Sequence, residues 1–303
     1  MLLVFQPAEE GYAGGQKMVE EGVLTDKIAG PSVDAIIGLH LWNYDNVGRV
    51  TTRLGGVMAN SDRFRVRVKG MGGHGAAPHG TVDAVLVASN IVMALQSIVS
   101  RNINPTSPAV VTCGMVRGGH AFNIIADDVE ILGTCRSYDA GVQHVIAQRI
   151  KAISEGIAAG YGAGVEVDYW RGYPATINVD PVTVKNVLSA AEAVVGGDNV
   201  GEPNLTLGGE DFAYFLHKVP GCFFFVGSAP DGTPVGSRPH HRSDFTLNED
   251  CLQVGASVML QVAEDMLITQ TSAFPEPLAE VIESYKTSMA DAPVKGVKTS
   301  GEK

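Results

Sequence analysis

Two adjacent carboxylates near the start of the chain could carry metal or proton-transfer chemistry. Glu9 and Glu10 belong to the segment Gln6–Gly11, which directly follows a short apolar run, Leu2–Phe5, that predicts a buried strand. His40 ends a second apolar run at residues 34–39. Ligands of open parallel sheets bind outside the carboxyl ends of the strands, so all three side chains should lie at one sheet edge. A carboxylate and an imidazole suit a divalent metal, and a second acid could take a proton from an activated water.

The same residues have a plainer interpretation. Glu9 and Glu10 could be a solvated pair in a loop, and His40 could flank a helix. Spacing alone leaves both interpretations open.

A second pair of candidate ligands lies late in the chain. His240 and His241 stand in a loop between a triple-Phe strand at residues 222–226 and a helix that Thr246-Leu247-Asn248-Glu249 should open as a capping box. They could supply another metal ligand at a sheet edge, or they could be ordinary exposed loop residues.

Three glycine-rich motifs show where the backbone turns tightly or approaches another group closely. They are residues 72–79, which contain His74, residues 118–123, which end in Asn123, and residues 208–212, which contain Gly209 and Glu210. The first two motifs are also typical of ordinary turns. Arg136, at the end of a strand, does not by itself indicate a function. The third predicts a substrate-side loop, or simply a helix start with favourably placed acids.

The elements that must position these residues follow two patterns. Up to about residue 59 and again from 173, apolar runs and helices predict an α/β domain with a mostly parallel sheet. Between 60 and 172, the alternation in 63–69, a helix from Asp83 to about Ser100, strands at 109–116 and 129–135, and an amphipathic helix capped by Asp139 predict a compact α+β insert. Residues 271–303 form a tail that we expect to be disordered from about 284.

Composition excludes some classes of function. The 303 residues carry 22 Lys and Arg against 33 Asp and Glu, a net charge of −11, which argues against a nucleic-acid partner. Four scattered cysteines indicate reduced thiols. We find no apolar run long enough for a membrane span and no signal peptide, and we expect a cytoplasmic protein with no membrane partner.

Taken together, the motifs resemble one family in order and spacing. Residues 5–11, 38–40, 72–79, 122–127, 208–215 and 241–245 look like the aminoacylase and carboxypeptidase-type metallohydrolases (peptidases), in the branch of auxin (IAA)-amino acid conjugate hydrolases and hippurate hydrolases. The resemblance extends to about residue 268. It implies an α/β metallopeptidase-like catalytic domain, residues 1–59 and 173–270, with an inserted α+β dimerisation domain at 60–172.

The resemblance also implies roles for the candidate residues. Glu9 would be the general base and His74 would stabilise the tetrahedral intermediate in the partner subunit's active site. The metal ligands would be Glu10, His40 and His241. The substrate would be held by Asn123, Arg136, Gly209 and Glu210.

The family implies a metal-dependent amidohydrolase that cleaves the amide bond of an N-acyl amino acid or amino acid conjugate. Metal-activated water would attack, with a Glu as general base. The cofactor would be manganese or zinc, as a pair in the intact family, and the protein would be a homodimer.

The chain departs from the family at its start. A Cys-Gly-His-Asp motif that supplies two ligands in the family does not occur here, so we expect an N-terminally truncated catalytic domain with a partial metal site. Apolar surface around Leu2 and the triple-Phe strand should then be exposed. The alternative is a catalytically silent, dimerising remnant.

Overall fold

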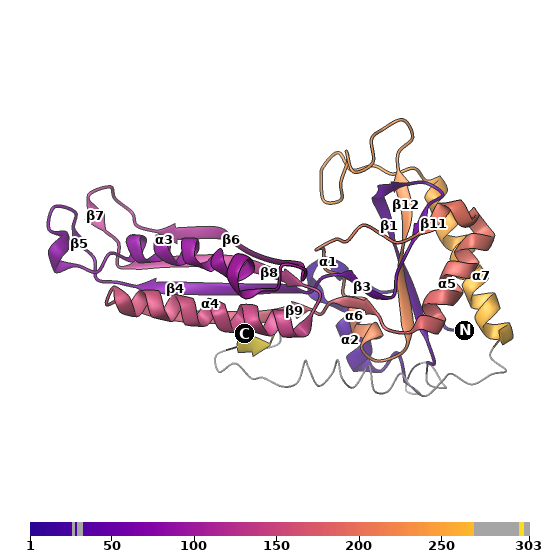
Figure 1. Cartoon of the computed structure of the whole chain (residues 1–303), viewed down its shortest axis with the longest axis horizontal. Helices are drawn as coiled ribbons and strands as arrows, with labels where there is room; N and C mark the ends of the chain where they lie inside the picture. The colour runs from indigo at the N-terminus through magenta and orange to yellow at the C-terminus, as the bar shows by residue number, and fades with distance from the viewer. Residues whose placement is uncertain (26–27, 29–32, 270–296, 300–303) are drawn as a thin grey trace. The chain divides into compact units, whose positions relative to one another are not determined.

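The structure, a computed structural model, describes residues 1–25, 28, 33–269 and 297–299 (Figure 1). Contacts divide the chain into two compact units. Unit 1 comprises Met1–Met58, Thr176–Thr206 and the described residues from Glu210 to 269. Unit 2 comprises Ala59–Ala175, Leu207–Gly209 and the described residues 297–299. The roles expected for the two parts, catalysis and dimerisation, stay predictions.

Unit 1 is built from helices and strands drawn from both ends of the chain. In chain order they are α1 (Glu9–Tyr12), α2 (Gly14–Glu21), β1 (Ile36–Asn46), β2 (Val50–Thr51), β3 (Gly55–Met58), β10 (Thr176–Asn178), α5 (Pro181–Val195), η3 (Gly197–Asn199), β11 (Val200–Gly201), α6 (Ala213–Leu216), β12 (Gly221–Ala229) and α7 (Asp250–Thr269).

The main sheet of unit 1 has the order β1-β12-β2-β11 in the described ranges. β1 and β12 run parallel, β12 and β2 antiparallel, and β2 and β11 parallel. Every residue of β12 is buried, as its apolar run Cys222–Val226 predicts for a strand covered on both faces. Phe223 and Phe225 pack in one cluster with residues of α6, while Phe224 packs in another with residues of α5 and α7. The α/β fold class is therefore confirmed, with a sheet that is mixed in direction.

The first eight residues correct two expectations. Leu2–Phe5 is not a strand, because none of the described strands pairs with this segment. The side chain of Phe5 is 85% exposed. The strand predicted there, and the parallel strand–helix–strand unit that it would form with a helix at 16–21 and the run at 34–39, are therefore wrong. Leu2 is exposed as expected, but Phe223–Phe225 are at most 2% exposed, since α5, α6 and α7 cover both faces of β12.

Unit 2 is built around an antiparallel sheet. Its elements are β4 (Ser61–Lys69), β5 (Gly73–His74), η1 (Pro78–Gly80), α3 (Ala84–Leu95), η2 (Ile98–Asn102), β6 (Ala109–Gly118), β7 (Ile124–Ile125), β8 (Asp128–Ser137), α4 (Ala140–Gly160), β9 (Gly164–Tyr173) and β13 (Val297–Thr299).

The sheet of unit 2 has the order β13-β9-β4-β8-β6. In β4 the side chains of Phe64, Val66 and Val68 are fully buried while their neighbours face outward, as the alternation predicts. These three residues share one core with residues of α3 and α4, so both helices cover the same face of the sheet. Asp139 caps α4 through the Val142 amide, as predicted.

The last helix differs from expectation in two ways. The Thr246 capping box does not form; instead Asn248 Oδ1 accepts from the Asp250 amide at 3.0 Å, and α7 starts at Asp250. Residues 250–268 are also long and apolar enough, by length and composition, to cross a membrane, which we had not expected. Val258 and Val262 are buried against the sheet, while Leu252, Leu260, Leu267 and Ile268 of the same helix are exposed.

The tail expected to be disordered lies mostly outside the described residues. Within it, Val297–Thr299 form β13, which pairs in parallel with Tyr169–Arg171 of β9.

Candidate functional site

Glu9 and Glu10 are the first two residues of the short irregular helix α1. The residues flanking it, Ala8 and Ala13, have φ of 57° and 51°, in the left-handed region. His241 has φ of 65°, and in the described part of the chain no other non-glycine residue has positive φ. Such conformations cost on the order of 1–3 kcal/mol each and cluster at functional sites. The strained backbone positions in unit 1 therefore lie at or next to candidate site residues that the sequence indicates, namely Glu9, Glu10 and His241.

Two of the three predicted metal ligands, Glu10 and His241, lie close together in unit 1. Glu10 Oε2 is 3.6 Å from His241 Nδ1, and both side chains are about three-quarters exposed (75% and 73%). The charges of both residues act on the partly buried ring of His40. His40 lies within β1 rather than at its end, because the strand continues to Asn46.

The state of His40 suits a metal ligand. Its Nδ1 lies 2.6 Å from the Leu41 carbonyl oxygen. Because a carbonyl only accepts, Nδ1 carries the proton and Nε2 keeps its lone pair. Burial lowers the pKa of His40 from its usual 6.5, which favours the neutral ring that metals bind.

The donor types fit a divalent cation, although in the described part of the chain the group whose ligand atoms all lie within 4.8 Å of one another is Glu9, Glu210 and Asp211, not Glu10, His40 and His241. One carboxylate, Glu10, and two imidazoles, His40 and His241, are ligands that zinc and manganese accept. Cys222 of unit 1 does not add a ready ligand to this set, because burial raises its pKa to about 12 and its thiol stays protonated at neutral pH.

Glu9 belongs to a second cluster of acids. One carboxylate oxygen each from Glu9, Glu210 and Asp211 lie within 4.8 Å of one another. Gln6 donates to Asp211, and Asp211 Oδ2 accepts from the Gly15 amide at 2.8 Å.

A glycine brings this acidic loop against the sheet. A Cβ at Gly38 in β1 would lie 2.5 Å from the ring of Phe212, so only glycine allows the Phe212 ring to pack here. Phe212 fixes the residues before it, Glu210 and Asp211, beside Glu9.

Two carboxyls of this cluster titrate near neutrality. Burial, and then the charge of Glu210, raise the pKa of Glu9 from 4.5 to about 7. Burial also raises the pKa of Glu210 to about 7, although the Phe212 amide, which donates to it at 3.0 Å, acts in the opposite direction. A carboxyl with a pKa near 7 can exchange a proton with a reacting group at neutral pH.

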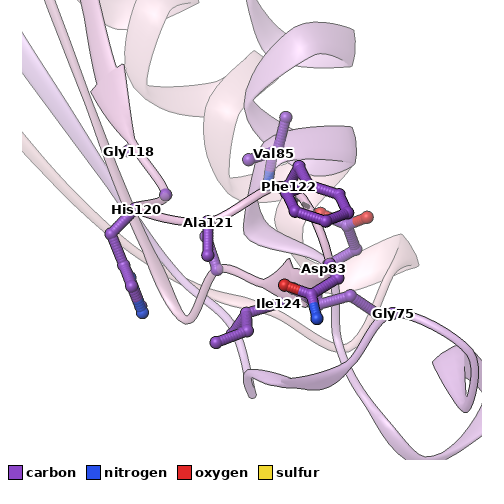
Figure 2. Close-up of a pocket in the computed structure, with 12 residues that line it drawn as sticks. Gly75, Asp83, Val85, Gly118, His120, Ala121, Phe122 and Ile124 are labelled. Carbon is purple, nitrogen blue, oxygen red and sulfur yellow. Dashed lines mark hydrogen bonds between the residues drawn. The ribbon is translucent and has the colours of Figure 1, made fainter.

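His74 and Asn123 lie together in unit 2. β5 pairs with β7, so that His74 faces Ile124, and the Gly75 amide donates to the Asn123 carbonyl oxygen at 2.9 Å. Both residues are exposed. Asn123 lines a pocket of about 580 Å³ together with Asp83 at the start of α3 and Phe122, whose side chain is fully exposed (Figure 2).

Arg136 and Gly209 lie at another place in unit 2. A Cβ at Gly209 would be 3.2 Å from a terminal nitrogen of Arg136, which stands near the carboxyl end of β8. Asn123 precedes the other end of that strand. The eight residue steps from Asp128 to Arg136 span roughly 26 Å, so one copy of unit 2 does not bring these two pairs together.

Sequence reasoning gave no role to Trp42 and Asn43, which lie in β1 close to His40. The ring of His240 stacks on Trp42 at 5.2 Å and meets His40 edge-on at 5.2 Å. Asn43, with 1% exposure, contacts the loop that carries both histidines. These contacts join residues almost 200 positions apart, so no local pattern could have indicated them.

Comparison with known proteins gives consistent results. The profile of Peptidase family M20/M25/M40 matches residues 1–265. N-acetyl-L-cysteine deacetylase of Bacillus subtilis (strain 168) is 36% identical over 267 residues, which cover 88% of this chain and 60% of that protein. IAA-amino acid hydrolase ILR1-like 4 of Arabidopsis thaliana is 35% identical over 272 residues, covering 88% and 60%.

A solved structure is similar as well. The YxeP protein of Bacillus subtilis, described as a dinuclear metal binding peptidase from the M20 family, aligns with a TM-score of 0.71 and 31% identity over 88% of this chain and 64% of that one. The chain therefore spans 60–64% of the length of these three proteins.

Proposed function

Because this chain belongs to peptidase family M20/M25/M40, we propose that it acts as a metal-dependent amidohydrolase on N-acyl amino acids or amino acid conjugates. The names of the relatives support this substrate class: one removes an acetyl group from N-acetyl-L-cysteine, and the other hydrolyses conjugates of IAA with an amino acid. Both reactions break an amide bond at the nitrogen of an amino acid. The observation that carries the proposal is the contact of Glu10 with His241, whose charges both act on His40, next to a carboxyl, Glu9, with a pKa near 7.

Glu10, His40 and His241 would hold a divalent metal, manganese or zinc. The 3.6 Å contact of Glu10 with His241 and the lone pair of His40 Nε2 support this ligand set. When bound, the metal supplies Lewis acidity toward the scissile carbonyl and the attacking water. Because a similar solved structure is described as a dinuclear metal binding peptidase, we extend the proposal to a site for two metals, in which Glu10, His40 and His241 are part of the ligand set.

Glu9 is the proposed general base. Its carboxyl is partly buried among acids, and its pKa of about 7 lets it take a proton from water and return it to the leaving amine near neutral pH. Glu10 stands outside the Glu9–Glu210–Asp211 cluster and contacts His241, which supports giving the two adjacent acids different roles.

The substrate's polar groups would be held by Arg136, Gly209, Glu210 and Asn123, with His74 stabilising the oxyanion. Arg136 beside Gly209 offers a cation for a carboxylate. His74 and Asn123 lie at the far end of β8 from Arg136. This separation supports the proposal that they act in the active site of a partner subunit.

A homodimer formed through residues 60–172 would bring His74 and Asn123 of one subunit to the active site of the other. β6 is an edge strand of the described sheet, and unpaired edges are templates for pairing. On the neighbouring helix α3, Met93 is 76% exposed and Leu86 49% exposed. A second copy of this chain would cover both features.

The test is hydrolysis of a panel of N-acetyl amino acids and IAA–amino acid conjugates by the purified chain. Added manganese or zinc should give turnover that a chelator abolishes, and the oligomeric state should be measured in the same samples. Binding of neither metal, or equal turnover with and without chelator, would contradict the proposal.

A further inference from the structure

Asn43 connects the strand that carries His40 to the loop that carries His240 and His241. It lies in β1 and its side chain is 1% exposed. Its amide Nδ2 donates to the carbonyl oxygens of Arg238 at 3.0 Å and Thr246 at 2.7 Å. A primary amide has two N–H donors, so these bonds use both of them.

The acceptor side of the same amide is tied to the sheet. Ser228 Oγ, at the end of β12, donates to Asn43 Oδ1 at 2.5 Å. The backbone of Asn43 adds two contacts with the loop: its carbonyl oxygen accepts from the Gly236 amide at 2.8 Å, and its amide donates to His240 Nε2 at 3.4 Å. One buried residue therefore joins β1, β12 and the loop.

The bonded carbonyls stand on either side of His241. Arg238 precedes it and Thr246 follows it, so Asn43 holds both ends of the segment 238–246. The segment needs such support, because His241 has φ of 65°. A strained residue keeps its conformation only when its surroundings over-determine it.

Bonds within the segment do not join its two ends. Arg242 and Asp244 form a two-pronged ion pair, with distances of 2.8 and 2.9 Å, and the Phe245 amide donates to the Arg242 carbonyl oxygen at 3.1 Å. These contacts shape the middle of the segment. Asn43 supplies the side-chain hydrogen bonds that fix both ends of the segment relative to β1, in addition to the stacking of His240 on Trp42.

We propose that Asn43 is a positioning residue: it clamps segment 238–246 so that His241 is presented beside Glu10 and His40. This inference rests on the proposed function only in taking His241 as a metal ligand. An aspartate at position 43 has the same shape and keeps the Ser228 bond, but it turns an acceptor oxygen toward two carbonyl oxygens. Asn43→Asp therefore removes the clamp while it preserves the packing.

The experiment compares Asn43→Asp and Asn43→Ala with a matched control, Asn178→Ala. Asn178 is equally buried, and its Nδ2 donates to the carbonyl oxygens of Arg53 at 3.0 Å and Phe223 at 2.9 Å. Its Oδ1 accepts from the Phe223 amide at 2.7 Å, so it too is a clamp, but it has no contact with segment 238–246. Melting temperature, hydrogen–deuterium exchange of peptides covering 230–248, and zinc affinity of the metal-free chain by calorimetry are measured for all variants.

Both Asn43 variants should speed amide exchange in 236–246 and weaken zinc binding, each by about tenfold or more, because the carbonyl oxygens of Arg238 and Thr246 lose their donor. Asn178→Ala should lower the melting temperature to a similar degree and leave both quantities within about threefold of the parent. If both Asn43 variants fail to fold, Ser228→Ala, which removes one bond of the clamp, should move both quantities in the same direction.

The outcomes separate this inference from the proposed function. If the parent binds no zinc, the proposed ligand set fails, and the exchange data alone decide whether Asn43 clamps the loop. Exchange in 236–246 that matches the Asn178 control overturns the clamp. Faster exchange with unchanged zinc affinity overturns the positioning of His241.

Discussion

Replacing Glu9 by Gln tests the division of labour between the two adjacent acids. Gln keeps the size of Glu9 but cannot accept a proton, so hydrolysis should fall by roughly 10²–10⁴-fold. At 1.36 kcal/mol per tenfold, this corresponds to roughly 3–5 kcal/mol in the barrier. Metal content should stay near that of the parent, because Glu9 stands with Glu210 and Asp211 rather than in the 3.6 Å contact between Glu10 and His241.

The same substitution should stabilise the metal-free protein in a pH-dependent way. The pKa of Glu9 is about 7 in the folded chain against an ordinary 4.5, so the folded state holds a proton that the unfolded state has lost. The variant should therefore show no advantage below about pH 4.5, a growing one up to about pH 7, and a constant one above. The full shift would give roughly 3 kcal/mol, but Glu9 is only partly buried and solvent screens it, so about 1 kcal/mol is expected.

The assays are kcat on an N-acetyl amino acid, metal content by mass spectrometry, and urea unfolding of metal-free protein between pH 4 and 8. Glu10→Gln is the matched control, since it should lose metal as well as activity. If Glu9→Gln lost the metal and Glu10→Gln kept it, the roles would be reversed, and the carboxylates of Glu9, Glu210 and Asp211 would be the better ligand set.

Other changes have equally definite expected results. Asp62→Asn should lower the unfolding free energy by about 1–3 kcal/mol, because buried Asp62 accepts from Gln143 and Tyr169 with both oxygens and an amide offers only one; an unchanged urea midpoint would contradict this. Phe224→Ala should cost about 3–5 kcal/mol in the same assay, since the ring is fully buried; a loss below 1 kcal/mol would show that the core collapses around the gap. Met93→Asp should shift the protein toward monomers in sedimentation without lowering its melting temperature, and a monomeric parent would refute the dimer. Chelation of bound metal should lower the melting temperature, by the equivalent of about 2.7 kcal/mol for metal at a hundredfold excess over its Kd, and equal melting curves would argue against a metal site.

Elements whose causes are local could be predicted from the sequence. The alternation of Arg and apolar residues gave β4, and Asp139 caps α4 where expected. Period and capping depend on neighbours a few residues away, so one sequence is enough to identify them. The all-apolar run of β12 likewise required cover on both faces.

Elements that need a distant partner could not be predicted in this way. Leu2–Phe5 has the composition of a strand, but a strand exists only where another strand completes its hydrogen bonds, and no described strand does so here. The capping box predicted at Thr246 failed for a similar reason, because residues of this segment form other hydrogen bonds. The Thr246 carbonyl accepts from Asn43, and Asn248 caps α7 instead.

For the candidate site, the sequence by itself supplied the types of donors and their order in the chain: two acids, then His40, then His241. Only the tertiary structure decided their environments. Burial of Glu9 beside Glu210, some 200 residues away, sets its pKa near 7, and Asn43 fixes the loop that carries His241. Charge, burial and hydrogen-bond satisfaction depend on which groups are close in space, and folding brings these groups together from the two ends of the chain.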